Sequence, residues 1–396
     1  MTYRMLAAAT NHPDPVNPYF GLFNARSIQA LTCRDVTVDV VSPRPFAPPL
    51  GPYSEYREIP PVSDGNGYSV HHPRFFYGVP KRLLYGLSGS SYAKRVPRYV
   101  EETFETPDVV HAYHIYLDGY GMMGYARDRD LPLFAVAHGA ALNGFEEFGR
   151  GVRSRIRKTV EACDELLCVS ETLARRAEEV APGVTTRVVP IGADPGVFPV
   201  DQRDRIRREL GIPSDVPVVF FCGQYTERKG LNEVIDVLPG FEDSEVHFVF
   251  AGQDGELRRP LRNAILETGI SDQVEIHYDV TDEALRRFFA IADLLMLPSY
   301  SEGRPTVIYE AMASETAVLA SEVDGIPEQV SDGVTGRLIP PRDASALRDA
   351  LREMCSDRAR LREMGVAGYR RLVDEGWTWE AHAERVEGIH REYAER

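Results

Sequence analysis

The stretch Ser301-Glu302-Gly303-Arg304-Pro305-Thr306-Val307-Ile308-Tyr309-Glu310-Ala311-Met312-Ala313 runs from a loop into a helix. The apolar run at residues 293–299 directly before it ends in Pro and Ser, which predicts a buried parallel strand. Pro305 fits the first helical position, where its missing N–H costs no hydrogen bond, and residues 306–313 favour a helix. We therefore expect Glu302 in the loop at the carboxyl end of the strand and Glu310 about two turns into the helix.

Two acids beside a helix N-terminus suit a ligand that carries both hydroxyl groups and phosphate. The first amides of the helix, with Gly303 beside them, can hold an anion, and phosphate is a common one. If one Glu binds sugar hydroxyls and the other binds ribose hydroxyls, the result is a nucleotide-sugar site. The alternative is an acid that favours the helix dipole together with a solvated Glu in the middle of the helix.

Further motifs after this stretch carry a family resemblance. Residues 311–313 are followed by Ala320-Ser321, by Gly325-Ile326-Pro327-Glu328 and by Asp332-Gly333-Val334-Thr335-Gly336. With Glu302 and Glu310, this series resembles the nucleotide-sugar-binding half of the retaining glycosyltransferases of family 4, whose architecture is called GT-B. The resemblance implies an α/β fold of two Rossmann-like domains with an interdomain cleft. It also implies that Glu302 faces the hydroxyls of the donor sugar and Glu310 the ribose of the nucleotide.

The rest of the chain alternates between apolar runs and polar or periodic stretches, as parallel α/β sheets require. The runs in the first half lie at residues 3–8, 36–41, 109–111, 132–137, 166–169 and 188–191, and those in the second half at 218–222, 246–251, 274–277, 294–297 and 317–320. The segment 191–199 is rich in Gly and Pro, which is typical of a linker. We predict an acceptor-side domain at residues 1–194, a nucleotide-sugar-binding domain at 195–375 and, from the resemblance, a C-terminal helix at 376–396 that packs back on the first domain.

A second phosphate-binding segment follows the strand predicted at 218–222. It reads Gly223-Gln224-Tyr225-Thr226-Glu227-Arg228-Lys229-Gly230, and a glycine at a strand end with a lysine before a helix can hold phosphate. The segment is similar to the family's Gly-Arg-Leu-x3-Lys-Gly, which implies that Lys229 contacts the diphosphate. Gln224 departs from the family's arginine, and Arg228 is the nearby cation that could compensate. The alternative is a surface Arg-Lys pair in a loop.

The first half supplies residues for the acceptor and the sugar. The segment at residues 15–24 resembles the family's first-strand loop, which implies that Gly21 lies near donor phosphate and acceptor. Ala135-Val136-Ala137-His138-Gly139 ends a predicted strand and resembles the family's Thr-Val-His-Gly, which implies that His138 faces the reacting sugar. His111 and His114 are three residues apart, so a metal pair is conceivable, but no third ligand is apparent and we interpret them as packing residues. His71 and His72 are interpreted as surface loop residues.

The resemblance thus implies two sets of site residues. The catalytic set is His138, Lys229 and Glu302. The donor-binding set is Gly21, Gly223, Gln224, Arg228, Lys229, Val280, Glu302, Gly303, Arg304, Pro305, Thr306, Val307 and Glu310.

The expected chemistry is transfer of a hexose-type sugar from a nucleoside diphosphate to a hydroxyl acceptor, with retention of configuration. We expect that the chain has no Asp-x-Asp motif of the metal-dependent transferases and needs neither metal nor cofactor, because Lys229, helix amides and Arg228 can stabilise the leaving diphosphate. A β-phosphate oxygen is the expected proton acceptor, so that His138 positions the sugar. Two alternatives stay open: a nucleotide-sugar epimerase or hydrolase of the same architecture, and a non-catalytic nucleotide-sugar-binding protein.

Composition and charge agree with a two-domain enzyme of the cytoplasm. The chain has 396 residues, of which 43% are hydrophobic, enough for two cores of about 150 to 200 residues each. The N-terminus is too short for a signal peptide and reads as a first strand. The five cysteines are scattered, which favours reduced core thiols over disulfides or a metal site. The chain carries a net charge of −15, and its sequence contains no recognisable nucleic-acid-binding motif. Both observations disfavour nucleic-acid binding.

The charge is distributed unevenly between the two halves. Residues 1–200 carry 21 Lys and Arg against 22 Asp and Glu, a net −1, which leaves 24 against 38, a net −14, for residues 201–396. Basic segments of the first half can rest on anionic lipid, so we predict a possible location at the inner face of the membrane and a glycan or lipid-linked acceptor. An ordinary solvated helix face is the alternative. The cations in question are Lys81, Arg82, Lys94, Arg95, Arg98, Arg150, Arg153, Arg155, Arg157 and Lys158.

Overall fold

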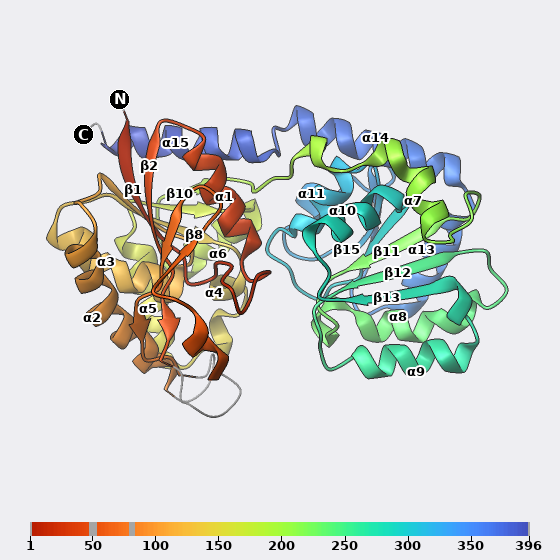
Figure 1. The fold of residues 1–396 in the computed structure, drawn as a ribbon, viewed down its shortest axis with the longest axis horizontal. Coiled ribbons are helices and arrows are strands. Elements are labelled where there is room, and N and C mark those ends of the chain that lie inside the picture. The colour runs from red at the N-terminus through yellow and green to blue at the C-terminus, as the bar shows by residue number, and fades with distance from the viewer. Residues whose placement is uncertain (1, 47–53, 79–83, 395–396) are drawn as a thin grey trace. The chain divides into compact units, whose positions relative to one another are not determined.

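A computed structural model describes residues 2–46, 54–78 and 84–394. The chain divides into two compact units (Figure 1). Unit 1 comprises Met1–Ile191 and Trp379–Arg396, and unit 2 comprises Gly192–Thr378. Unit 1 therefore ends at residue 191, three residues before the predicted boundary at 194. It resumes at residue 379, three residues after the predicted start of the C-terminal helix at 376.

Unit 1 is built on an eight-stranded sheet of order β10-β9-β8-β7-β1-β2-β5-β4. The pairs are parallel except that β4 runs antiparallel to β5. Its strands are β1 (Tyr3–Ala8), β2 (Val36–Val41), β4 (Val62–Asp64), β5 (Ser69–His71), β7 (Val109–Ala112), β8 (Leu133–Ala137), β9 (Glu165–Cys168) and β10 (Thr186–Val188), beside the small pair β3 (Arg44–Pro45) and β6 (Arg74–Phe75). The helices are α1 (Leu22–Thr32), α2 (Tyr85–Thr103), α3 (Tyr120–Asp128), α4 (Ala140–Asn143), α5 (Arg150–Ala162), α6 (Glu171–Val180) and α15 (Trp379–Ala394).

Helix α15 belongs to unit 1 although it is the last element of the chain. It lies along α1 in Figure 1, and Arg34, just beyond the end of α1, forms an ion pair with Glu387. Further in, Tyr3 OH on β1 lies 2.8 Å from His390 Nδ1. The predicted C-terminal helix that packs back on the first domain is thus confirmed.

Unit 2 has a six-stranded, entirely parallel sheet of order β13-β12-β11-β14-β15-β16. Its strands are β11 (Val218–Cys222), β12 (His247–Gly252), β13 (Val274–Tyr278), β14 (Leu294–Leu297), β15 (Ala317–Ser321) and β16 (Gly336–Ile339). The helices are α7 (Arg203–Glu209), α8 (Leu231–Val237), α9 (Arg258–Thr268), α10 (Asp282–Ile291), α11 (Thr306–Ala313), α12 (Ile326–Gln329), α13 (Ala344–Cys355) and α14 (Arg358–Asp374). The central strands β11 and β14 are fully buried, which explains their unbroken apolar sequence.

The architecture of two Rossmann-like α/β units is as predicted, and the differences are local. Helix α11 starts at Thr306, so Pro305 caps the helix in an extended conformation and is not its first residue. The interpretation of His71 and His72 as surface loop residues was wrong. His71 ends β5, and the buried His72 accepts a hydrogen bond from Ser63 and donates one to Ser42 O. No helix within the described residues is long and apolar enough to cross a membrane.

Candidate functional site

Two loops lie side by side at the carboxyl edge of the unit 2 sheet, because their strands β11 and β14 are neighbours. The N–H of Tyr300 donates to Arg228 O at 2.8 Å, and the Arg228 guanidinium donates back to Ser301 O at 3.0 Å. Gly230 has a φ of +71°, and a Cβ added there would lie 1.9 Å from Pro298 O. Only glycine therefore allows the two loops to approach this closely.

Glu302 lies between two cations at this loop junction. Lys229 Nζ forms an ion pair with Glu302 Oε1, and Arg228 Nη1 lies 3.8 Å from Oε2. The Glu302 and Lys229 side chains are only 9% and 13% exposed, whereas Arg228 is 53% exposed. Burial alone would raise the pKa of the Glu302 carboxyl, but the charges of Lys229 and Arg228 lower it below its usual value. The structure thus brings the three predicted residues together, and the lowered pKa keeps the Glu302 carboxyl ionised at neutral pH.

Asp324 holds the loop that carries Glu302, and the sequence reasoning missed it. Its carboxylate accepts hydrogen bonds from Ser301 Oγ at 2.7 Å and from the Glu302 N–H at 2.9 Å. Asp324 has a φ of +47°, a conformation that Asp tolerates better than most residues. The available signal was an Asp-Gly pair after a buried strand, which is typical of a turn.

Glu310 is buried, with 6% of the residue exposed. It lies on α11, which follows β14, and β14 pairs with β11 in the sheet. The alternative of a solvated Glu in mid-helix is therefore wrong.

The residues at the start of α11 differ in where their side chains lie. Arg304 is 4% exposed and turns to Glu328 Oε2 at 3.3 Å, with its guanidinium carbon 4.9 Å from the centre of the Trp377 ring. Pro305 is buried, and its carbonyl accepts from Gln329 Nε2 at 3.1 Å. The other predicted residues of this segment, Gly303, Thr306 and Val307, are partly exposed.

The remaining predicted donor residues of unit 2 also lie at the carboxyl edge of the sheet. The Lys229 side chain passes Gly223, since a Cβ added there would be 3.5 Å from Lys229 Cδ. Gln224 is exposed, and its Nε2 reaches Asp254 O on the next loop at 3.4 Å. Val280 follows β13 and is partly exposed.

In unit 1, Gly21 occupies a position that only glycine fits. Its φ is +71°, and a Cβ would lie 2.4 Å from the carbonyl of Asn11. The loop that leads to it is fixed by a buried ion pair, in which Arg44 Nε lies 2.7 Å from Asp14 Oδ2. The Arg44 guanidinium also donates to His12 O at 2.6 Å. Gly21 is thus held in a rigid, closely packed loop at the carboxyl end of β1.

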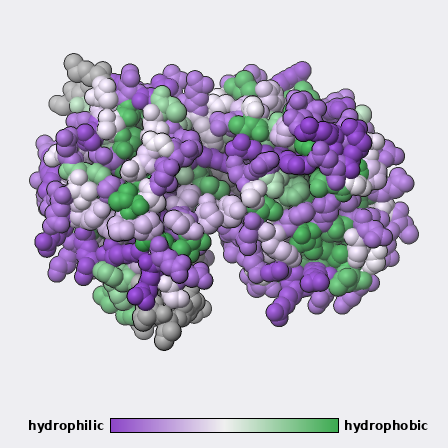
Figure 2. Space-filling model, in the orientation of Figure 1, coloured by the Kyte–Doolittle hydropathy of each residue, from purple (hydrophilic) through white to green (hydrophobic). Residues whose placement is uncertain are grey.

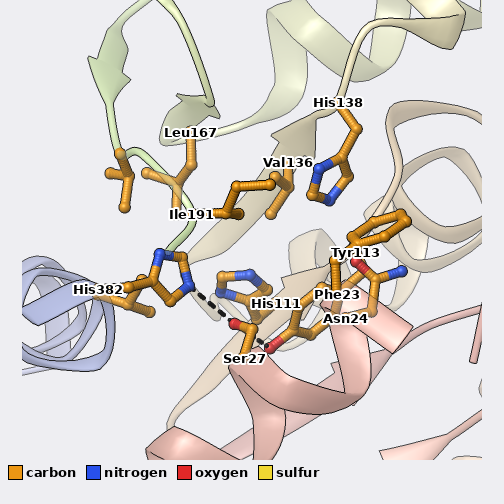
Figure 3. A pocket seen from close by; sticks show the side chains of 12 residues that line it. Phe23, Asn24, Ser27, His111, Tyr113, Val136, His138, Leu167, Ile191 and His382 are labelled. Carbon is orange, nitrogen blue, oxygen red and sulfur yellow. Dashed lines mark hydrogen bonds between the residues drawn. The ribbon is translucent and has the colours of Figure 1, made fainter. Parts of the chain in front are cut away.

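His138 follows β8 and is partly exposed, and its side chain lines the pocket drawn in Figure 3. Its ring contacts Phe23 at 4.7 Å and His114 at 5.4 Å between centroids. Burial lowers the pKa of His138 well below its usual value, so the imidazole is neutral. His138 and Gly21 both follow carboxyl ends of unit 1 strands, where α/β sheets bind ligands.

His111 and His114 bind different partners. His111 Nδ1 lies 2.9 Å from His390 Nε2, and His114 Nδ1 donates to Asp118 at 3.2 Å. No group of His, Cys, Asp or Glu in the described ranges is arranged to hold a metal. One Asp-x-Asp sequence does occur, at residues 128–130, but it lies at the end of α3, before the start of β8 and thus at the other edge of the sheet from His138.

Comparisons with known proteins place both halves of the chain among sugar-transferring enzymes. Residues 202–371 match the family model described as glycosyl transferases group 1, and residues 25–197 match the model described as glycosyltransferase family 4. TuaC of Bacillus subtilis, which carries the name teichuronic acid biosynthesis glycosyltransferase, is 27% identical over 88% of each chain. A D-inositol 3-phosphate glycosyltransferase of Geodermatophilus obscurus is 32% identical over 80% of this chain and 76% of its own.

Solved structures agree in fold. The sucrose-phosphate synthase of Thermosynechococcus elongatus has a TM-score of 0.79 at 20% identity, over 98% of each chain. Anabaena Alr3699/HepE, solved in complex with UDP and glucose, has a TM-score of 0.73 at 17% identity, over 98% of this chain and 99% of its own.

Proposed function

Because the chain belongs to the GT-B glycosyltransferases, we propose that it moves a hexose-type sugar from a nucleoside diphosphate to a hydroxyl acceptor, with retention of configuration. The observation that carries this proposal is the placement of Lys229, Arg228 and Glu302 together at the carboxyl edge of a parallel sheet, with Glu310 buried nearby. Ligands of open α/β sheets bind at that edge.

The two cations have distinct places in the proposed reaction. The partly buried Lys229 is held by Glu302, so its ammonium group is oriented before a substrate arrives. The exposed Arg228 is free to move toward a ligand from its anchor on Ser301 O. Both can stabilise the negative charge that develops on the leaving diphosphate, and no metal is needed for that task in this proposal.

The acids would bind the two sugars of the donor. Glu302 would accept hydrogen bonds from the hydroxyls of the transferred sugar, and its lowered pKa keeps it an acceptor at neutral pH. Glu310 would bind the ribose hydroxyls. In unit 1, the neutral His138 would position the sugar, Gly21 would let the backbone approach it, and a β-phosphate oxygen would take the proton of the acceptor.

Turnover of a radiolabelled donor tests this function against its two alternatives. The donor is first chosen by a thermal-shift screen of UDP-, GDP- and ADP-sugars, since a bound ligand raises the melting temperature. We expect label to pass to an acceptor. Release of free nucleotide without an acceptor would identify an epimerase or hydrolase, and binding without turnover would identify a non-catalytic protein.

We further propose that unit 1 docks on anionic membrane and takes a lipid-linked acceptor. Four exposed apolar residues support it: Phe46, Phe76, Leu84 and Leu87 are 42% to 53% exposed. Two of these residues contact α2. The guanidinium of Arg95 lies 4.9 Å from the Phe46 ring centre, and the N–H of Phe76 donates a hydrogen bond to the hydroxyl of Ser91. Most of the surface in view is hydrophilic (Figure 2). Apolar residues beside cations are what a lipid surface binds.

Among the predicted cations that the structure describes, several already have partners. Lys81 and Arg82 lie outside the described residues. Arg98, Arg153, Arg155 and Arg157 have partners within unit 1. Co-sedimentation with anionic vesicles should therefore depend on apolar contact as well as on salt, and Leu87→Ser should weaken it, whereas the equally exposed Val373→Ser in unit 2 should not. Absence of binding at low salt would indicate a soluble acceptor.

A further inference from the structure

A small cavity beside His138 gathers three buried polar atoms (Figure 3). The space open to the centre of a water molecule is about 10 Å³, which is close to what one water needs. Asn24 Oδ1, His111 Nε2 and His138 Nε2 belong to its lining residues, and none of the three atoms has a hydrogen-bond partner in the described part of the chain. Buried polar groups are normally paired, so three such atoms around one cavity point to a bridging water.

The polar side chains on the opposite side of the cavity already have hydrogen-bond partners. The dashed lines in Figure 3 mark the hydrogen bonds of Ser27 with His382 and with Tyr113. His382 Nδ1 donates to Pro190 O at 2.9 Å, because a carbonyl can only accept. His382 Nε2 then accepts from Ser27 Oγ at 2.8 Å, and Tyr113 OH donates to Ser27 at 3.1 Å. Burial lowers the pKa of His382 to about 4, so this chain holds a neutral imidazole in one tautomer.

A second chain of hydrogen bonds leads from β1 to the cavity. Tyr3 OH lies 2.8 Å from His390 Nδ1, and His390 Nε2 lies 2.9 Å from His111 Nδ1. Tyr3 is buried, and its hydroxyl hydrogen needs an acceptor, which His390 Nδ1 provides. His390 must then carry its proton on Nε2 and donate to His111, which leaves His111 with its proton on Nε2, directed at the cavity.

The third cavity atom is fixed as an acceptor. Asn24 Nδ2 donates to Asn11 O at 2.7 Å, so Oδ1 is the amide atom of this cavity-lining residue that is left buried without a partner. A water there accepts from His111 and donates one hydrogen to Asn24. Its second hydrogen is left for His138 Nε2.

We propose that one buried water completes a directed chain from Tyr3 through His390 and His111 to His138, and that this chain keeps the His138 proton on Nδ1. His138 Nδ1 is not among the buried side-chain atoms that lack a partner, and His138 is partly exposed, so the hydrogen-bond chain leaves the proton on the ring nitrogen that does not face the proposed water. Tyr3, His390, His111 and Asn24 are positioning residues for that donor. Its use on the transferred sugar rests on the proposed function, whereas the tautomer does not.

Nitrogen-15 NMR of the full-length protein with labelled histidine tests the chain directly. In the wild type we expect His138 Nδ1 to be protonated and Nε2 to resonate as an unprotonated nitrogen. Tyr3→Phe removes the hydrogen that sets the direction, so both His138 tautomers should be populated. Transfer should then slow by about twofold or more, because only one tautomer is competent.

Tyr113→Phe is the matched control, since it removes an equally buried hydroxyl from the other chain and should leave the His138 tautomer unchanged. A wild-type His138 protonated on Nε2 would overturn the proposal, even if Tyr3→Phe does not fold. An unchanged tautomer in a folded Tyr3→Phe would overturn it too. If NMR shows the predicted tautomers but the protein transfers no sugar, the proposed hydrogen-bond chain stands and the proposed function is wrong.

Discussion

The two units hold their candidate residues by different forces. His138 in unit 1 lies next to chains of neutral, buried histidines and tyrosines, whereas Glu302 in unit 2 lies between Lys229 and Arg228. The first arrangement fixes direction and tautomer, and the second fixes charge. The difference matches the two tasks of the proposed reaction, which are to orient an uncharged sugar and to stabilise a charged leaving group.

The histidine-rich core predicts that unit 1 is the more acid-sensitive unit. Burial lowers the pKa of His12, His72 and His382 to about 4 and that of His390 to about 3. In the unfolded chain these groups bind protons near pH 6.5, so their contribution to stability is complete above that pH and is lost as pH falls toward 4. Each can cost up to about 1.4 kcal/mol per pH unit in this window.

Unit 2 contains a carboxyl group, Glu275, whose contribution to stability is lost at lower pH than that of the histidines. Burial would raise the pKa of Glu275, but hydrogen bonds from His247 and His277 lower it to about 2. Its contribution to stability is present above the unfolded value of 4.5 and is lost only below it. Hydrogen exchange read by mass spectrometry between pH 7 and 5 should therefore show unit 1 losing protection first. Parallel loss in both units would contradict the comparison.

Lys229→Ala should have the largest effect on activity. It removes the partly buried cation of the site and leaves Glu302 with the exposed Arg228 alone, so transfer should fall by about 100-fold or more. Arg228→Ala is the matched control and should cost less, because that side chain is 53% exposed. Calorimetric titration measures the affinity of the same variants for the nucleoside diphosphate. Unchanged affinity in Lys229→Ala would show that this lysine does not contact the diphosphate.

His138→Ala should slow transfer while nucleotide affinity stays nearly constant. The loss of one positioned polar contact in the transition state costs about 2 to 4 kcal/mol, or some 30- to 1000-fold in rate. Rate and nucleotide affinity are measured on the same preparation. Normal turnover would reduce His138 to a packing residue against Phe23 and His114.

The paired acids should separate binding from turnover. Glu310→Ala should weaken donor binding by about 10- to 100-fold, and Glu302→Ala should lower kcat more than affinity. Glu315→Ala, two residues beyond the end of α11, serves as the exposed control. Wild-type transfer in both site variants would remove the basis of the unit 2 assignment.

Gln224→Arg should have the smallest effect. The exposed Gln224 makes one long contact, 3.4 Å to Asp254 O, so an arginine can replace it at little structural cost. A new cation near the diphosphate should preserve donor affinity or raise it a few-fold. Lower affinity in a calorimetric titration would show that the glutamine itself binds the donor.

The same contrast explains what could be predicted from the sequence. Strands β1, β2, β11 and β14 were predicted at their observed bounds, because mainly apolar runs between polar segments have few other interpretations. The pair β3–β6 was missed because each strand has only two residues, and the edge strand β16 was missed because its four residues include Gly336 and Arg337 and form no apolar run. The strand predicted at residues 188–191 is observed as β10 at Thr186–Val188, so the two ranges share only Val188.

The site residues divide in the same way. Glycines and charged residues at strand ends are visible as motifs, and so Lys229 and Glu302 could be named in advance. Asp324 could not, because its partners Ser301 and Glu302 lie 23 and 22 residues away on another loop. The hydrogen-bonded series Tyr3–His390–His111 could not either, because its members are up to 387 residues apart and meet only through the packing of α15. Pair contacts at such separation leave no local pattern in a single sequence.

Proton NMR of the first-formed product tests the central claim most directly, because the anomeric coupling shows whether the donor site performs the proposed transfer. With the donor identified by the thermal-shift screen and a hydroxyl acceptor present, we predict a glycoside with the same anomeric configuration as the donor sugar. An inverted product would contradict the retaining mechanism assigned to Lys229, Glu302 and His138.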